Sequence, residues 1–176
     1  MRFTPMSLSG AYLVQLEPRI DARGTFARAF CAREFAAQGL TASFMQANIS
    51  TNLKAGTVRG LHFQNAPHRE AKLVQCVKGS IYDVVVDIRE ESATYLRWTG
   101  VELSDSNGVM IYVPEGFAHG YQTLSDGANV LYLVSEFYTP DVEGGLRCND
   151  PKLGIKWPLA VSDISEKDGR WPLLPA

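Results

Sequence analysis

Residues 57–64 (TVRGLHFQ) combine the alternation of a β-strand with two side chains that can do chemistry, Arg59 and His62. A guanidinium binds phosphate oxygens through two parallel donors, and an imidazole gains or loses a proton near neutral pH. Three positions apart, the two side chains would lie on opposite faces of a regular strand. If both serve one site, we expect Gly60 between them to supply a bend or bulge.

Two further segments carry ionisable residues. In 81–89 (IYDVVVDIR), Asp83 and Asp87 share one face of a predicted strand with a valine, and such a face is more often solvated than catalytic. An interior cavity would reverse that preference. In 112–126 (YVPEGFAHGYQTLSD), Glu115 and His119 lie between glycines in a predicted turn, where a histidine is as often a surface residue as part of a site.

Histidine spacing argues against a metal site. The chain has three histidines, His62, His68 and His119. Metal-binding jelly rolls use two histidines separated by one residue, but here Phe63 and Gln64 follow His62. His68 lies too far along an extended chain to replace the missing ligand. We therefore expect no metal, and His62 is free to act as a general base.

Short apolar runs separated by turn residues must position these side chains. The predicted strands cover 11–18, 43–50, 71–77, 81–89, 98–104, 108–114 and 129–138. The KGS turn predicts that 71–77 and 81–89 form a hairpin. Residues 31–39 predict the one clear helix, and the C-terminal segment is loop-rich. Many short strands and one helix predict an all-β fold, an antiparallel jelly-roll sandwich or barrel that holds a small ligand between its sheets.

Composition narrows the class further. A chain of 176 residues, 45% hydrophobic and 20% charged, predicts one domain (1–176) with a sizeable core. A net charge of −2 with mixed signs argues against nucleic acid as the main partner. The chain has no run of about 18 apolar residues and no signal-peptide core, which argues against a membrane span. Three widely spaced cysteines predict reduced thiols in a cytoplasmic protein.

The order of the motifs resembles one family along nearly the whole chain, from residue 8 to residue 174. The motifs are RGLHFQ (59–64), KLVQCVKGSIYDVVVDIR (72–89), VPEGFAHGYQTLSD (113–126), LYLVSEFYTPDVEGG (131–145), NDPKLGIKWP (149–158) and ISEKD (164–168). They resemble the dTDP-4-dehydrorhamnose 3,5-epimerase family. The resemblance implies a cofactor-free jelly roll of the cupin class that forms homodimers by strand exchange. The implied reaction inverts C3 and C5 of dTDP-4-dehydro-6-deoxy-D-glucose, a step of dTDP-rhamnose biosynthesis.

The resemblance also implies roles for individual residues. His62 matches the general base and Asp168 the carboxylate that orients it. Lys72 matches the cation beside the sugar ketone, and Tyr132 matches the acid on the opposite face. The implied substrate-binding residues are Gln46, Asn48, Arg59, His119, Tyr138, Glu143 and Lys167, together with Arg23 and Phe26, which approach the nucleotide from the partner subunit.

Four positions depart from the family pattern. Arg28 replaces a glutamate associated with the nucleotide base, and Ile49 replaces a histidine. Leu133 and Glu136 replace a lysine and an asparagine around Tyr132. These changes leave open an epimerase that inverts only C3 or C5, another nucleotide, a keto-isomerase on the same fold, or a non-catalytic sugar-nucleotide-binding module. The presence of His62 together with Lys72, Tyr132 and Asp168 favours an enzyme over a binding module. The RGLHFQ and EKD segments favour an epimerase over a keto-isomerase.

Overall fold

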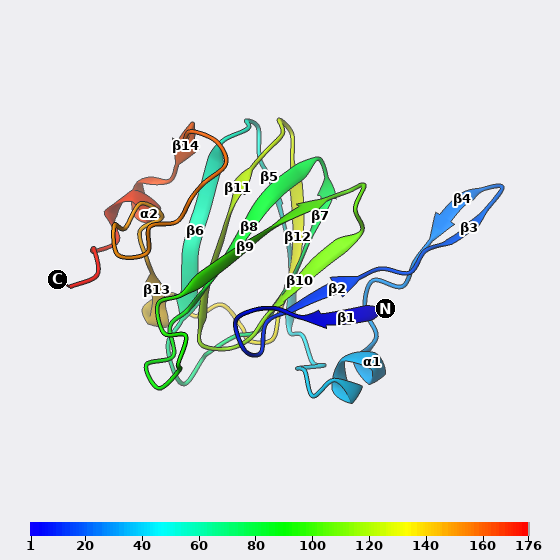
Figure 1. Cartoon of the computed structure of the whole chain (residues 1–176), viewed down its shortest axis with the longest axis horizontal. Helices are drawn as coiled ribbons and strands as arrows, with labels where there is room; N and C mark the ends of the chain where they lie inside the picture. The colour runs from blue at the N-terminus through cyan, green and yellow to red at the C-terminus, as the bar shows by residue number, and fades with distance from the viewer. Residues whose placement is uncertain (176) are drawn as a thin grey trace.

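Two antiparallel sheets pack face to face in the computed structural model, which describes residues 1–175 (Figure 1). The first sheet has the order β1 (Arg2–Pro5), β2 (Tyr12–Gln15), β10 (Val109–Val113), β7 (Lys72–Lys78), β12 (Asn129–Val134) and β5 (Gln46–Thr51). The second has the order β13 (Glu143–Gly145), β6 (Thr57–Gln64), β11 (Phe117–Thr123), β8 (Ser80–Asp87) and β9 (Trp98–Ser104), and β14 (Asp163–Ile164) pairs with β6. The predicted all-β jelly roll is confirmed.

The remaining elements are short. A hairpin of β3 (Arg19–Asp21) and β4 (Gly24–Phe26) projects from the body of the molecule (Figure 1). Helix α1 (Ala32–Ala37) falls within the predicted helix, and helix α2 (Glu166–Arg170) lies near the C-terminus beside β6. A 3-10 turn, η1, covers Pro140–Val142. None of the helices within residues 1–175 combines the length and the apolar character that crossing a membrane requires.

The main core fills the space between the sheets and adjoins the polar cavity described below through Tyr121. Val74 and Ile111 of the first sheet belong to this core. Ile81, Val85 and Phe117 of the second sheet belong to it as well. Period-2 alternation directs these side chains inward, since neighbouring residues of a strand face opposite sides. Burying them provides the main stabilising term of the fold.

The outer faces of both sheets carry secondary cores. Phe35 of α1 is fully buried against the first sheet, with Phe3 and Phe30 at ring-centroid distances of 5.1 Å. On the second sheet, the C-terminal segment covers Val84 and Val86 of β8. Strand β8 is therefore buried on both faces, which explains its unbroken run of valines.

Two sequence expectations are corrected here. The hairpin predicted for 71–77 and 81–89 is wrong, because β7 and β8 lie in different sheets and do not pair. The turn at Gly79 carries the chain from one sheet to the other, and turn chemistry alone does not specify which strand is the next partner. The solvated face expected for Asp83 and Asp87 is also wrong, since both side chains are fully buried. The C-terminal segment covers the opposite face of β8, so the acidic face points between the sheets.

Candidate active site

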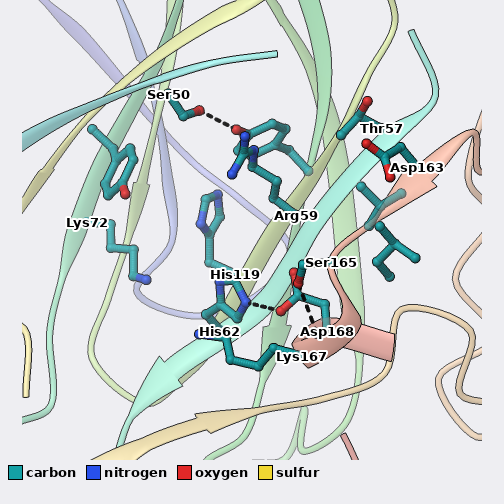
Figure 2. A pocket seen from close by; sticks show the side chains of 14 residues that line it. Ser50, Thr57, Arg59, His62, Lys72, His119, Asp163, Ser165, Lys167 and Asp168 are labelled. Carbon is teal, nitrogen blue, oxygen red and sulfur yellow. Dashed lines mark hydrogen bonds and ion pairs between the residues drawn. The ribbon is translucent and has the colours of Figure 1, made fainter. Parts of the chain in front are cut away.

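Two adjoining cavities open between the sheets and share His62, Lys72, Tyr132 and Lys167. The first has a volume of about 500 Å³ and the second about 400 Å³. The first is also lined by Ser50, Thr57, Val58, Arg59, His119, Tyr121, Asp163, Ile164, Ser165 and Asp168 (Figure 2). The second is also lined by Gln46, Asn48, Phe63, Gln64, Glu70, Val134, Tyr138 and Glu143.

A bulge in β6 brings Arg59 and His62 to the first cavity. His62 pairs with His119 and Arg59 pairs with Tyr121, so three steps along β6 match two along β11. Gly60 supplies the irregularity with a φ of +118°. Without the bulge, the two side chains would point to opposite faces of the sheet. The irregularity expected at Gly60 is confirmed, and both side chains line one cavity (Figure 2).

His62 and Asp168 form a hydrogen-bonded pair across 106 positions of sequence. Nε2 of His62 lies 2.6 Å from Oδ1 of Asp168, and the Gly60 N–H donates to Oδ2 of the same carboxylate at 3.1 Å. Burial raises the pKa of Asp168, but the hydrogen bond and charge of His62, followed by the Gly60 N–H, outweigh burial and lower the pKa below its ordinary value. Asp168 is therefore a carboxylate near neutral pH, and Nε2 of His62 donates to it. The other ring nitrogen, Nδ1, is then the proton acceptor.

Helix α2 and β14 hold Asp168 in place. Ile164 of β14 pairs in parallel with Val58 of β6, which fixes the C-terminal segment beside the strand that carries His62. Ser165 caps α2 by accepting the N–H of Asp168 at 3.1 Å. This local order directs the Asp168 side chain into the cavity wall, where it is 3% exposed.

Lys72 and Tyr132 approach from the first sheet, whereas His62 belongs to the second. Nζ of Lys72 lies 2.9 Å from Oε1 of Glu70. Burial is the largest cause that raises the pKa of Tyr132, the negative charge of Glu70 adds to it, and the positive charge of Arg59 opposes it. Tyr132 is therefore a neutral phenol near pH 7, able to donate a proton.

A second buried pair joins His119 to Asp83, with 2.9 Å between Nε2 and Oδ2. Burial raises the pKa of Asp83 above its ordinary value, although the charges of His119 and Lys72 oppose the rise. His119 lies in β11 and is 8% exposed, so the turn position that the sequence suggested is wrong. The glycine after it, Gly120, lies inside the strand, where it permits the close approach of β6.

Arg59 is held by a buried amide. Its Nε donates to Oδ1 of Asn52 at 2.7 Å, while Nδ2 of Asn52 donates to the carbonyl of Ala128 at 3.0 Å. Tyr121 lines the same cavity, and its hydroxyl lies 2.5 Å from Oγ of Ser50. Because Asn52 occupies Nε, the two terminal nitrogens of Arg59 remain to form a planar donor pair.

The second cavity has a charged rim. Nζ of Lys167 lies 2.8 Å from Oε1 of Glu143, and the Tyr138 hydroxyl donates to Oε2 at 3.0 Å. Gln46 accepts the backbone N–H of Tyr138 at 2.7 Å. Asn48, the neighbour of Gln46 on the same face of β5, completes this group of polar side chains.

Arg23 and Phe26 lie outside both cavities of their own chain. They belong to the β3–β4 hairpin, which projects from the body of the molecule (Figure 1). Phe26 is 74% exposed, and Arg23 pairs with Asp21. Arg28, just after the hairpin, pairs with Glu34 at 2.8 Å. Within one chain, the structure therefore brings together all the predicted site residues except Arg23 and Phe26.

The sequence analysis missed several polar residues of the site, among them Glu70, Asn52 and Tyr121. Glu70 precedes Lys72 by two positions at the start of an apolar strand, and this spacing puts two side chains on one face. The sequence therefore contains a local indication that Glu70 accompanies Lys72. Asn52 and Tyr121 meet Arg59 only through the pairing of strands far apart in sequence, so no local pattern marks them.

Comparison with known proteins gives the family. The family model described as dTDP-4-dehydrorhamnose 3,5-epimerase matches residues 5–176. The chain belongs to the dTDP-4-dehydrorhamnose 3,5-epimerase family. Members of this family are isomerases that act on sugar nucleotides.

Individual members of the family match along most of their length. The dTDP-4-dehydrorhamnose 3,5-epimerase of Methanothermobacter thermautotrophicus is 44% identical over 173 residues, which are 97% of this chain and 92% of that relative. A dTDP-4-dehydrorhamnose 3-epimerase of Streptomyces niveus is 40% identical, over 96% of this chain and 81% of that relative. The crystal structure of the 3,5-epimerase from Bacillus anthracis, with TDP and PPi bound, superposes with a TM-score of 0.95 at 40% identity, over 98% of this chain and 99% of that chain.

Proposed function

We propose that this epimerase inverts C3 and C5 of dTDP-4-dehydro-6-deoxy-D-glucose and forms dTDP-4-dehydro-L-rhamnose. The observation that carries the proposal is the His62–Asp168 pair, which lines the same cavity as Lys72 and Tyr132. These four side chains supply a base, its orienting carboxylate, a cation and an acid. The reaction consists of proton transfers alone, and these groups suffice for it.

His62 removes the proton in the first half of each inversion. The hydrogens on C3 and C5 flank the C4 ketone, and removal of either one places negative charge on the ketone oxygen. Nδ1 of His62 takes the proton, while Asp168 holds Nε2–H and stabilises the imidazolium that forms. Lys72 meets the developing oxyanion with its ammonium group, which provides electrostatic stabilisation in a largely buried site.

Tyr132 returns a proton in the second half. Inversion requires delivery from the face opposite the base, and Tyr132 enters the cavity from the sheet opposite to that of His62. Burial, followed by the charge of Glu70, keeps the Tyr132 pKa above its ordinary value, so the phenol carries its proton at neutral pH. Solvent then restores the phenol and the histidine for the next centre.

The nucleotide diphosphate needs a separate set of contacts. The two terminal nitrogens of Arg59 donate together to two oxygens of the diphosphate. His119 of β11 lines the same cavity and also binds the substrate there. The Bacillus anthracis relative was crystallised with TDP and PPi, which agrees with a diphosphate ligand. The remainder of the substrate occupies the second cavity. There it contacts polar side chains of the cavity wall: Gln46, Asn48, Tyr138, Glu143 and Lys167.

A homodimer completes the site in this proposal. The hairpin of β3 and β4 projects from its own chain and exposes Ile20 and Phe26 by 78% and 74%. Insertion into a second copy would bury these side chains and bring Arg23 and Phe26 to the partner's nucleotide. The cysteines are all free thiols, which agrees with a reducing cytoplasm.

A second candidate is inversion at C3 alone. The Streptomyces niveus relative is a 3-epimerase at 40% identity, so overall similarity does not separate the two activities. In β12, Leu133 adjoins Tyr132 and departs from the family pattern, as Glu136 does just beyond the strand. A shift of the phenol relative to C5 would leave only C3 inverted.

Proton NMR in deuterated water tests the proposal with purified protein and dTDP-4-dehydro-6-deoxy-D-glucose. We expect deuterium at both C3 and C5 and a product of rhamno configuration. Deuterium at C3 alone would establish the 3-epimerase instead. Tight binding of TDP without any exchange would contradict an epimerase and favour a binding module or another nucleotide.

A further inference from the structure

Lys72 forms an ion pair with Glu70, and its charge also acts on Asp83. Its ammonium pairs with Glu70 at 2.9 Å, and the two side chains are only 9% and 10% exposed. Its charge also opposes the rise that burial causes in the Asp83 pKa. Oδ1 of Asp83 is buried and has no hydrogen-bond partner within residues 1–175. The structure thus pairs the Lys72 ammonium directly with Glu70, whereas Asp83 pairs with His119.

The backbone beside Glu70 is also fixed, and an amide lies near its second oxygen. Ala71 donates its N–H to Oγ of Ser135 at 2.8 Å and accepts the Ser135 N–H at 3.0 Å, which secures the chain between Glu70 and Lys72. Nε2 of Gln64 approaches Oε2 of Glu70 at 3.4 Å. Glu70 thus lies between Gln64 of β6 and Lys72 of β7 at the cavity wall.

Gln64 is itself immobilised by backbone contacts. Its Nε2 donates to the carbonyls of His68 and Phe137, and its Oε1 accepts the Thr139 N–H at 2.7 Å. Gln64 is 5% exposed, so this arrangement is part of the packed wall. A carboxylate between a fixed amide and a lysine restricts where the ammonium can lie.

We propose that Glu70 is a positioning residue that holds the Lys72 ammonium in the cavity. An ammonium has three donors, so one N–H on Glu70 leaves two for the substrate. This inference rests on the proposed function, because the position of Lys72 matters to catalysis only if a ketone oxygen gains negative charge beside it. Glu70 touches no reacting atom; it acts mainly through Lys72, and its charge also raises the pKa of Tyr132.

Kinetics of three variants test this inference. Glu70→Ala removes the acceptor, and displacing Lys72 should lower kcat by about tenfold to a hundredfold with KM nearly unchanged. Glu70→Gln retains an oxygen acceptor for Lys72 and should restore kcat to within about threefold of the wild type. Glu115→Gln removes an exposed carboxylate on the β10–β11 turn and serves as the control. Thermal melting confirms that each variant is folded.

A double-mutant cycle separates action through Lys72 from a general structural effect. If Glu70 acts through Lys72, adding Glu70→Ala to Lys72→Ala should lower kcat no further. Independent, multiplicative losses would overturn the inference, as would wild-type kcat in Glu70→Ala. A wild type that neither forms product nor incorporates deuterium would refute the proposed function itself, and the role of Glu70 would fall with it.

Discussion

Asp168 accepts a hydrogen bond from Nε2 of His62 over 2.6 Å, and its other oxygen accepts the N–H of Gly60, two positions before His62. One carboxylate thus fixes both the ring and the bulge that aims the ring into the cavity. The pair spans the join between the C-terminal segment and β6. The tautomer of His62 and the shape of β6 therefore depend on the same side chain.

Replacing Asp168 by Asn should remove most activity without removing the hydrogen bond. An amide can turn its NH₂ toward Nε2, which leaves the proton on Nδ1, where His62 must accept one. We expect kcat to fall by about a hundredfold or more, with a smaller change in KM. Glu166→Gln, an exposed neighbour on α2, is the control. Steady-state kinetics check this, and an Asp168→Asn enzyme with near-normal kcat would contradict the assigned tautomer.

Asn52→Ala should weaken nucleotide binding through Arg59. Loss of the 2.7 Å bond to Nε frees the guanidinium to rotate, and a hydrogen bond to a charged group contributes about 1.5–3 kcal/mol. The Kd for TDP, measured by calorimetry, should rise by about tenfold. Asn149→Ala removes an exposed amide that accepts a hydrogen bond from Nε of Arg147, and it should leave Kd unchanged. An equal change in both variants would show that Asn52 has no specific role.

Gly120→Ala should destabilise the fold at the bulge. A Cβ there would lie 2.6 Å from the carbonyl oxygen of Arg59 and 2.9 Å from Cδ2 of Leu61. We expect the free energy of unfolding to fall by about 1–3 kcal/mol in denaturant titrations. Gly169→Ala, which meets nothing within 4 Å in α2, should be neutral or slightly stabilising. Unchanged stability in Gly120→Ala would mean that β6 and β11 do not approach so closely.

Asp87 should make the fold sensitive to acid. Burial raises its pKa, but hydrogen bonds from Arg89, Ser92 and Thr94 outweigh burial and hold the pKa well below the ordinary 3.8. The resulting stability is present above about pH 3.8, the ordinary value expected in the unfolded chain, and is lost as the pH falls below it. Asp87→Asn should therefore lower the unfolding free energy at pH 7 and flatten its decline in acid.

Urea titrations between pH 7 and pH 3 check this prediction. Asp141→Asn, on the exposed η1 turn, should retain the wild-type pH dependence. An Asp87→Asn profile parallel to that of the wild type would assign the acid sensitivity to other carboxylates.

Local patterns predicted the strands and the Gly60 bulge because alternation and glycine act over a few residues. They failed where burial is decided at long range. Asp83 and Asp87 looked solvated, since nothing near them in sequence shows that the C-terminal segment covers the other face of β8. The turn at Gly79 reverses the chain but does not specify the next sheet.

The site residues likewise include some that a local sequence pattern indicates and others that meet only through long-range contacts. The spacing of Arg59 and His62 placed them on opposite faces of a regular strand, and Gly60 between them indicated the bulge that could bring both to one pocket. Asp168 lies 106 positions from His62, and only the family resemblance linked the two. Asn52 is fixed to Arg59 by the meeting of separate segments, and no short motif encodes that contact.

Deuterium incorporation in Tyr132→Phe, compared with the wild type and His62→Ala, tests the two-sided proton transfer most directly. Each protein is incubated with dTDP-4-dehydro-6-deoxy-D-glucose in deuterated water, and exchange and configuration are read separately by proton NMR. We predict that Tyr132→Phe exchanges protons with retained configuration, whereas His62→Ala does not exchange and still binds TDP. Exchange at the wild-type rate in His62→Ala, or equal loss of exchange and inversion in Tyr132→Phe, would contradict the assignment of base and acid to opposite faces.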